Sequence, residues 1–206
     1  MKQLVFFIAI ICSISILIAS CSKDEETQTD AEKAEAAEAA AIAAIGLNGT
    51  WKGTCGSASS DNSTYGVQSL VSSGTSFSAD WSQYSDSECS TKNSTEIEAF
   101  KLDLGDAYTL ADGNTAHKGV LTLVSSLLTL YTSSYVNTLD SISYCGKEWV
   151  INTAIDKAGL TCGGTEQDSA GVKTYIPYYI NGTSLRFGTS TADNVTSLDS
   201  VTYTKQ

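Results

Sequence analysis

Polar and apolar residues alternate in short runs between residues 46 and 206, and Gly, Asn and Asp separate the runs. A period of two places successive side chains on opposite faces of a strand, which is typical of half-buried antiparallel strands. Such runs occur at residues 64–71, 75–81, 95–104, 119–124, 174–180, 183–188 and 199–205. The pattern predicts an all-β domain of about eight to ten strands, closed into an antiparallel barrel or folded into a sandwich.

Three local signals refine this expectation. Asn181-Gly182 lies between two alternating runs and is the strongest hairpin signal in the chain. Pro177 is the only proline, and because it has no backbone N–H it should lie at an edge, a bulge or the start of a strand. Residues 147–159 are the single candidate for a short helix inside the domain.

Residues 22–45 have a different composition, mainly Ala, Glu, Asp, Lys and Thr, with no aromatic residue. The stretch 31–45 favours a helix strongly by intrinsic propensity. Its apolar side is almost entirely alanine, so packing can stabilise the helix only weakly. We therefore expect a helical tether that acts as a semi-rigid spacer. A coiled coil through Ile42 and Ile45 is the alternative, but sustained heptads are missing.

The first twenty residues carry one charge, on Lys2, followed by an apolar stretch from Leu4 to Ile18. This arrangement is typical of a secretory signal peptide. The alternative is a membrane-spanning helix, which needs roughly 20 apolar residues and is therefore longer than this stretch. The expected organisation is a signal peptide at 1–20, a tether at 21–45 and a β-barrel domain at 46–206.

The end of the apolar stretch reads Ile18-Ala19-Ser20-Cys21 and resembles a bacterial lipobox. This resemblance implies that Cys21 becomes the first mature residue and carries a diacylglycerol, with a further acyl chain such as palmitate in many bacteria. Two or three chains give a stable membrane anchor, whereas one chain binds only marginally. Because Ser22 does not mark retention in the inner membrane, the resemblance favours lipid anchoring in the outer membrane of the cell envelope.

The formal net charge is −11, and removal of Lys2 with a signal peptide makes the mature chain more negative. An acidic surface repels nucleic acids and anionic lipid headgroups. Since the sequence has no basic run that could bind phosphates, nucleic acid is not an expected partner.

Four cysteines remain in the domain: Cys55, Cys89, Cys145 and Cys162. In an exported chain an even number of cysteines indicates disulfides, and four cysteines allow three pairings. Proximity in the sequence favours Cys55 with Cys89 and Cys145 with Cys162. A zinc site with four thiolates is the alternative, but no Cys-x-x-Cys pair occurs.

Gly49-Thr50-Trp51 resembles the Gly-x-Trp that begins the first strand of lipocalin-like barrels. The resemblance implies that Trp51 packs across the closed end of the barrel with an arginine from a late strand over its ring. Arg186 is the only arginine and falls in a late alternating run, so it is the expected cation. Alternatively, Trp51 is ordinary core and Arg186 ordinary surface. The second motif of true lipocalins and the helix after their last strands are missing.

Trp51 and Cys55, followed by residues 84–89 (YSDSEC), resemble a second family. This is the repeated domain of the adenomatosis polyposis coli down-regulated protein, together with bacterial lipoproteins of similar pattern. The spacing from tryptophan to cysteine is one residue shorter here. The resemblance implies a disulfide-braced, barrel-like sheet with a lipid-sized hydrophobic cavity.

Candidate catalytic residues are few. His117, the only histidine, lies among turn residues, and the sequence has no Gly-x-Ser-x-Gly nucleophile elbow with which it could form a catalytic triad. Glu96 and Glu98 share a strand face and could form an acid pair for glycoside chemistry, although such pairs are more often solvating. A calcium site is a further alternative, but its spacing differs from an EF-hand loop. Its candidate ligands are Asp103, Asp106 and Asp112.

The leading hypothesis is a non-enzymatic, membrane-anchored surface lipoprotein whose barrel binds a small hydrophobic or lipid-like ligand. No cofactor and no metal are expected, and the sequence does not identify the ligand-binding residues. The alternative is an adhesin or envelope interaction module in which a solid barrel binds a protein or glycan. Tyrosines are compatible with either function and also with ordinary sheet packing. They gather at Tyr131, Tyr135, Tyr144, Tyr175, Tyr178 and Tyr179.

Overall fold

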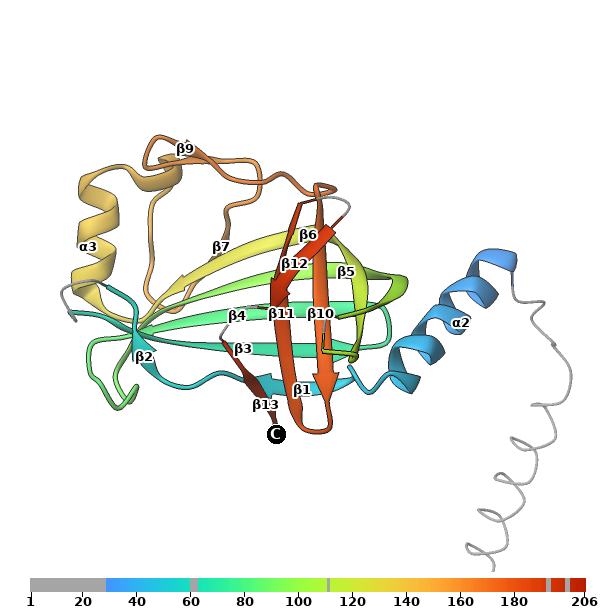
Figure 1. The fold of residues 1–206 in the computed structure, drawn as a ribbon. Helices are drawn as coiled ribbons and strands as arrows, with labels where there is room; N and C mark the ends of the chain where they lie inside the picture. The colour runs from blue at the N-terminus through green and yellow to red at the C-terminus, as the bar shows by residue number, and fades with distance from the viewer. Residues whose placement is uncertain (1–28, 60–62, 111, 192–193, 199–200) are drawn as a thin grey trace, which may run out of the picture. The chain divides into compact units, whose positions relative to one another are not determined.

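The computed structural model describes residues 29–59, 63–110, 112–191, 194–198 and 201–206 (Figure 1). The expected signal peptide and the expected lipidation site, Cys21, lie outside the described residues. Within the described part of the chain, no helix is both long enough and apolar enough to cross a membrane.

The chain divides after Ala34 into two compact units, Met1–Ala34 and Glu35–Gln206. Of the first unit, the structure describes the beginning of helix α2 (Asp30–Ala44). Thr29 and Glu32 form a capping box there: the N–H of Glu32 donates to the Thr29 hydroxyl at 3.3 Å, and the N–H of Thr29 donates to the Glu32 carboxylate at 2.6 Å. The predicted helix therefore forms, and its start is fixed by two reciprocal hydrogen bonds.

Among the described residues, eight strands form a closed antiparallel barrel (Figure 1). Their order around the barrel follows the order in the chain, and β1 closes the ring by pairing with both β3 and β13. The eight are β1 (Gly49–Lys52), β3 (Tyr65–Ser73), β4 (Ser76–Tyr84), β5 (Lys92–Thr109), β6 (Thr115–Leu130), β10 (Lys173–Asn181), β11 (Ser184–Thr191) and β13 (Tyr203–Lys205). The expected lipocalin-like barrel is confirmed, and the sandwich alternative is wrong.

Short strands extend or flank this ring. They are β2 (Gly56–Ser57), which pairs with β3; β7 (Ala154–Asp156), which pairs with β6; β12 (Asn194–Leu198), which pairs with β11; and β8 (Thr161–Cys162), which pairs with β9 (Thr165–Glu166).

The hairpin predicted from Asn181-Gly182 is the connection of β10 to β11. Pro177 lies inside β10 rather than at its start. In the described pairing, β10 is paired with β11 only from Tyr178 onward. The proline is therefore accommodated where the strand has a partner on one side, which is how edge positions tolerate a missing N–H.

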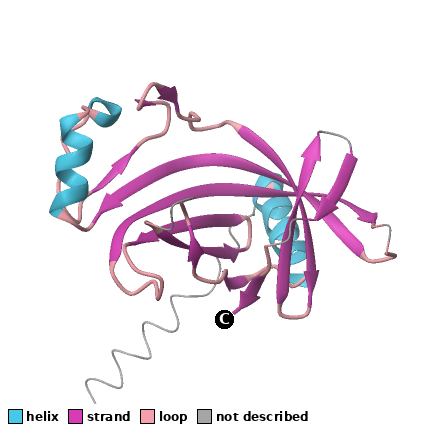
Figure 2. Ribbon diagram, turned by 60° about the vertical axis from the view of Figure 1, so that its left-hand side comes forward, coloured by secondary structure: helices cyan, strands magenta, loops and turns pink. Residues whose placement is uncertain are grey.

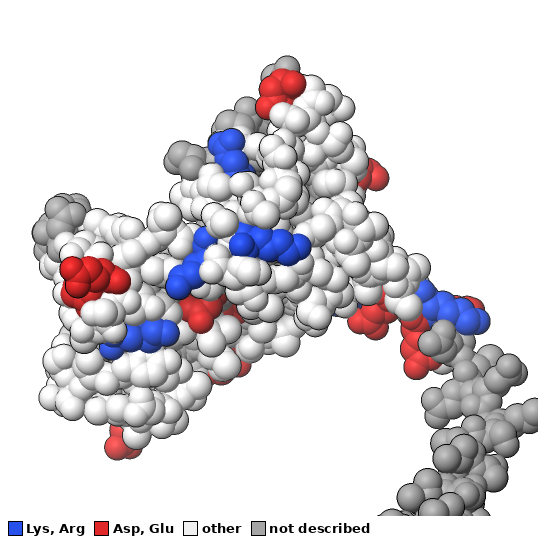
Figure 3. Space-filling model, turned by 90° about the horizontal axis from the view of Figure 1, so that it is seen from below, with Lys and Arg blue, Asp and Glu red and all other residues white. Residues whose placement is uncertain are grey.

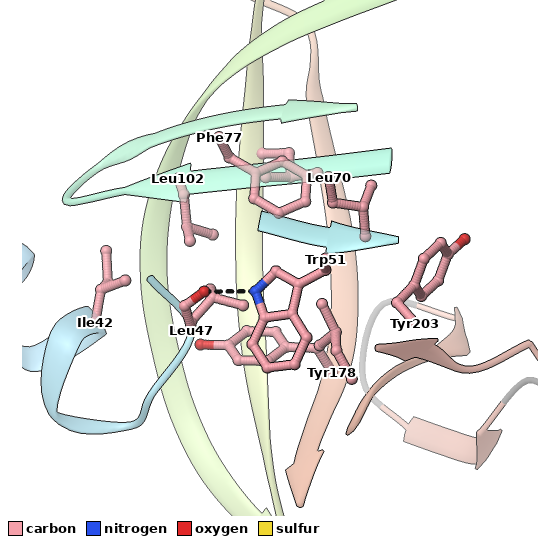
Figure 4. Packing of buried hydrophobic residues seen from close by; sticks show 10 residues of the cluster. Ile42, Leu47, Trp51, Leu70, Phe77, Leu102, Tyr178 and Tyr203 are labelled. Carbon is pink, nitrogen blue, oxygen red and sulfur yellow. Dashed lines mark hydrogen bonds between the residues drawn. The ribbon is translucent and has the colours of Figure 1, made fainter. Parts of the chain in front are cut away.

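One end of the barrel is filled by apolar side chains (Figure 4). Trp51, Tyr178 and Leu185 are completely buried there. The cluster of buried residues consists of Ile42, Leu47, Trp51, Leu70, Phe77, Leu102, Leu121, Tyr178, Leu185 and Tyr203. This end of the barrel is therefore a packed core, and we refer to it below as the closed end.

The second half of α2 belongs to this closed end. Ile42 is fully buried in the cluster. Glu35 accepts a hydrogen bond from the Thr75 hydroxyl at 3.1 Å, and Glu38 accepts one from the backbone N–H of Leu104 at 2.7 Å. The expectation of a semi-rigid spacer omitted this packing. The alanines near Ile42 are small, and a Cβ atom at Gly74 would lie only 3.3 Å from the Cβ of Ala39, so the helix approaches the barrel closely.

A long insertion, residues 131–172, joins β6 to β10 and contains helix α3 (Ser133–Ser141) and the short 3₁₀ helix η1 (Tyr144–Gly146). Figures 1 and 2 place α3 and the second half of α2 near opposite ends of the long strands β5 and β6. The helix expected at 147–159 is wrong. Asn152 has a left-handed backbone there (φ 61°), and Ile155 pairs with Leu128 in the β7–β6 ladder. Trp149 is instead buried among the apolar residues of the insertion.

Both disulfides expected from sequence proximity are present, Cys55–Cys89 and Cys145–Cys162. The first ties the segment after β1 to the β4–β5 loop, and the second ties η1 to β8 inside the insertion. The two crosslinks therefore restrain segments that lie outside the eight-stranded ring.

The loop that carries Cys89 is organised by Asp86. Its carboxylate accepts backbone N–H donations from Glu88 at 3.1 Å, Ser90 at 3.0 Å and Thr91 at 2.6 Å. These donors, chiefly the N–H groups of Ser90 and Thr91, lower the pKa of Asp86 to about 2. Cys89 itself has a left-handed backbone (φ 52°), so the charged Asp86 side chain fixes an unusual loop conformation beside the disulfide.

Candidate ligand-binding cavity

Trp51 anchors the closed end. Its indole Nε1 donates a hydrogen bond to the carbonyl oxygen of Leu47 at 2.7 Å (Figure 4). The Nζ of Lys205 lies 5.0 Å from the centroid of the indole ring and also donates to the carbonyl oxygen of Gly46 at 3.1 Å. A Cβ atom at Gly49 would lie 2.8 Å from Cε of Lys205, so the glycine makes room for the lysine stem. The Gly-x-Trp motif thus builds a cation–π contact that closes the barrel.

The expected role of Arg186 is wrong: Lys205, from the last strand, supplies the cation over Trp51. Arg186 does lie on a late strand, as predicted. Its neighbours Leu185 and Phe187 both face the barrel interior, so strand alternation turns Arg186 outward. There its Nη2 donates to the carbonyl oxygen of Leu198 at 3.4 Å.

Beyond the closed end, the barrel interior contains a cavity of about 250 Å³. Six strands, β3, β4, β5, β6, β10 and β11, contribute to its wall, and the insertion contributes Asp168 and Val172. The lining residues are Gln68, Leu70, Phe77, Ala79, Glu98, Phe100, Leu121, Leu123, Asp168, Val172, Thr174, Ile176 and Phe187. Most of these side chains are apolar, and the volume lies just below the roughly 300–1,000 Å³ typical of ligand pockets, so the cavity suits a small ligand.

A second, polar cavity of about 200 Å³ adjoins the first. The two share Glu98, Leu123 and Asp168, and the second is lined in addition by Ser126, Glu166 and Gln167. We call the first the inner cavity and the second the vestibule. The barrel interior therefore changes from apolar to acidic on the way from the closed end to the insertion.

Glu96 and Glu98 lie on the same inward face of β5, as their spacing predicts. Glu96 accepts a hydrogen bond from Nζ of Lys157 at 2.6 Å, and the lysine is only 3 % exposed. Nζ of Lys157 also donates to Gln167 Oε1 at 3.3 Å. This ion pair, in which the lysine is buried and Glu96 partly exposed, connects the insertion to the barrel wall beside the vestibule.

Glu98 has a different environment. Burial raises its pKa above the ordinary value, and the negative charges of Glu96 and Asp168 raise it further, while Lys157 acts in the opposite direction. No lysine or arginine of the described residues lies within salt-bridge distance of Glu98. Glu98 is therefore a partly buried carboxylate at the junction of two cavities without a directly paired cation.

Two further cavities continue the barrel interior near its open end, with volumes of about 220 and 190 Å³. Trp81 lines both and is 38 % exposed. A Cβ atom at Gly66 would lie 2.7 Å from Cζ2 of Trp81, so the indole lies directly on the glycine backbone. Tyr135 and Tyr144 of the insertion line the larger of these two cavities.

The other candidate residues lie elsewhere. His117 stacks on Tyr178 with ring centroids 5.6 Å apart, and burial lowers its pKa. Asp103 lies 3.6 Å from Lys101 Nζ. Among the described residues, no group of three or more His, Cys, Asp or Glu side chains is arranged to hold a metal ion. Tyr175 is 57 % exposed, so the tyrosines of β10 do not form a cavity wall together.

Charged side chains are sparse on the face of the molecule seen in Figure 3. Lys and Arg form small separate groups there, with larger uncharged areas between them, and no continuous basic strip runs across this face. Among the described residues, the vestibule is the place where charged side chains most clearly line a cavity.

A scan against protein-family models finds no match for this chain, and a search of the curated proteins finds none either. Function must therefore be inferred from the geometry of the barrel interior. The residues that the sequence did not indicate are Lys157, Asp168 and Lys205. Lys157 and Asp168 belong to the insertion, outside the alternating runs, and the folding of the insertion brings them to the barrel wall. Lys205 ends the last alternating run, and closure of the barrel brings it beside Trp51.

Proposed function

We propose that this protein is a lipoprotein of the bacterial cell envelope, anchored through Cys21, and that its barrel binds a small hydrophobic ligand without catalysing a reaction. The inner cavity carries the proposal. Its wall combines three phenylalanines with aliphatic side chains, and its two carboxylates, Glu98 and Asp168, also line the vestibule. Ligand sites commonly combine a mainly apolar wall with a few positioned polar groups.

The energetics of packing support this proposal. Deleting buried methyl or methylene groups costs stability because close-packed interiors contain few voids. The barrel has an inner cavity of about 250 Å³ next to a packed closed end, so it lacks at one specific place the stability that filled space would provide. An apolar ligand would restore the missing contacts.

Two further observations favour an exported, anchored protein. Residues 18–21 resemble a lipobox after an apolar leader-like stretch. Both disulfides join cysteines of the exported domain, and disulfides persist mainly in oxidising compartments outside the cytosol. Attachment of a barrel to the outer membrane through Cys21 would place its cavity beside a source of hydrophobic molecules.

The test is native mass spectrometry of the chain from Ser22 to Gln206, which keeps all of α2 and the barrel, produced in an oxidising compartment. We expect a bound small molecule whose mass is lost on denaturation. A bare protein mass, repeated after incubation with mixed envelope lipids, would contradict ligand binding.

A matched pair of variants assigns any bound molecule to the inner cavity. Ala79→Phe adds a ring to the cavity wall, whereas Ser78→Phe adds the same ring to the opposite face of β4. We expect Ala79→Phe to abolish the bound mass and Ser78→Phe to retain it, with both proteins folded by circular dichroism. Equal retention by both variants would place the ligand outside the inner cavity.

A second candidate function is an interaction module that binds a protein or glycan. Exposed apolar side chains of the insertion favour this second function: Ile142 is 60 % exposed, Val150 53 % and Ile151 38 %. Exposed apolar residues can mark a binding surface where they form a contiguous patch. Capture of a purified envelope protein or glycan by the wild type, lost on Ile142→Ser, would favour this function, particularly if the barrel carries no small molecule.

A further inference from the structure

The charges around the vestibule are strongly unbalanced. The residues that line the inner cavity and the vestibule include Glu98, Glu166 and Asp168, and they include no lysine or arginine among the described residues. Lys157 belongs to the insertion, and its Nζ is engaged by Glu96 at 2.6 Å and by Gln167, which lines the vestibule, at 3.3 Å. The positive charge of Lys157 is thus already paired with Glu96.

Glu98 and Asp168 are the two carboxylates that line both cavities. A group held between them lies at the mouth of the inner cavity, with the apolar wall directly behind it. Phe77, Phe100 and Phe187 supply the aromatic part of that wall. A single ligand that spans the junction must therefore be apolar at one end and complementary to negative charge at the other.

We propose that the ligand is an amphiphilic amine: a short alkyl or aryl group in the inner cavity, with a protonated nitrogen held by Glu98 and Asp168 at the vestibule. This inference rests on the proposed ligand-binding function and specifies its ligand class. An ammonium group can donate hydrogen bonds to carboxylates, and such charge-assisted bonds are stronger than neutral ones.

The position of Glu98 supports a cation over a neutral or anionic group. Burial and two neighbouring carboxylates raise the pKa of Glu98, which means that its ionised form lacks compensation in the protein alone. A bound ammonium would supply this compensation. A ligand carboxylate or phosphate would instead add another negative charge to the same place and would be repelled.

The test compares three ten-carbon probes, decylamine, decanol and decanoate, by isothermal titration of the chain from Ser22 to Gln206 at pH 7.5. The three have the same apolar chain and differ in their polar end. We expect the order of affinity decylamine, decanol, decanoate, with a difference of about tenfold or more between the amine and the alcohol, as for a hydrogen bond to a charged group.

Three variants locate the nitrogen. Glu98→Gln and Asp168→Asn should each weaken decylamine about tenfold and leave decanol within about twofold, because only the charged contact is lost. Glu88→Gln is the matched control, since it removes a carboxylate from an exposed loop outside both cavities. It should change neither affinity.

The outcomes separate the two proposals. If decanol and decanoate bind as tightly as decylamine, or if Glu98→Gln leaves the amine affinity unchanged in a folded variant, the amine inference is wrong and the hydrophobic-carrier function stands. If none of the probes binds at up to millimolar concentration and the purified chain carries no bound molecule, the carrier function itself is wrong.

Discussion

The two ends of the barrel are built on the same strands and differ in packing: one is filled by side chains, and the other is lined by cavities. Along the inward face of β5, Leu102 belongs to the closed end, Phe100 to the inner cavity, Glu98 to the junction and Glu96 to the ion pair with Lys157. At the closed end, the indole N–H of Trp51 donates a hydrogen bond to the carbonyl oxygen of Leu47. At the open end a carboxylate lacks a directly paired cation. The proposed function therefore separates stability from binding along a strand and not between domains.

Trp51 and Trp81 offer the largest expected contrast between the ends. Trp51 is completely buried and hydrogen-bonded, so Trp51→Ala should lower the free energy of unfolding by about 3–5 kcal/mol. Trp81 is 38 % exposed and lines the open-end cavities, so Trp81→Ala should cost about 1 kcal/mol or less. Urea denaturation with both disulfides intact measures the two values.

A similar loss of stability from both tryptophan variants would show that the open end is as important to the fold as the closed end. It would remove the separation that the proposed function assumes.

The second half of α2 gives the next contrast. Ile42 is fully buried and Ile142 in the insertion is 60 % exposed, so the same substitution can be made at both. Ile42→Ala should lower the free energy of unfolding by about 2–4 kcal/mol, and Ile142→Ala should change it by less than about 0.5 kcal/mol. An equally small effect at Ile42 would restore the view of α2 as a spacer that the barrel does not need.

The helix also shows where sequence reasoning stops. Its propensity predicts a helix correctly, because alanine and glutamate favour that conformation whatever surrounds them. Its docking depends on Ile42 reaching a cluster to which all eight strands of the barrel contribute, and no local pattern in the sequence records that contact. The alternation of polar and apolar residues is local in the same way. It therefore predicts the strands and places Glu96 and Glu98 on one face.

Contacts across the ring were harder to predict. The Gly-x-Trp resemblance placed a cation over Trp51, but the choice of Arg186 failed because β11 turns it outward and β13 brings Lys205 into register with Trp51. Lys157 lies in the stretch that the sequence suggests as a short helix, so the sequence does not predict its ion pair with Glu96 of the barrel wall. Disulfide pairing was predictable because the partners are close in sequence, only 34 and 17 residues apart.

The smallest expected effect concerns two carboxylates that serve opposite purposes. Asp86 is held ionised by backbone N–H donors, and its pKa is lowered to about 2. Its contribution to stability is present above the unfolded-state pKa and is lost as the pH falls toward 2. Asp86→Asn should therefore lower the Tm at neutral pH, and its difference from the wild type should disappear near pH 2.

Glu98 should behave in the opposite way. Its folded-state pKa is raised, chiefly by burial and then by Glu96, with Asp168 acting in the same direction and Lys157 against it. The folded state therefore binds the Glu98 proton more tightly than the unfolded state, so stability is highest below the unfolded-state pKa and declines as the pH rises through the folded-state value. Glu98→Gln should accordingly raise the Tm slightly at pH 7.5, and this gain should disappear on acidification toward the pH at which Glu98 is protonated. Thermal unfolding of both proteins between pH 4 and pH 8 measures this difference in Tm.

A lower Tm for Glu98→Gln at neutral pH would mean that the carboxylate stabilises the barrel, as Asp86 stabilises its loop. It would remove the reason to expect a cation at the vestibule. A gain in Tm together with a loss of amine affinity would identify Glu98 as a residue kept for binding at a cost in stability.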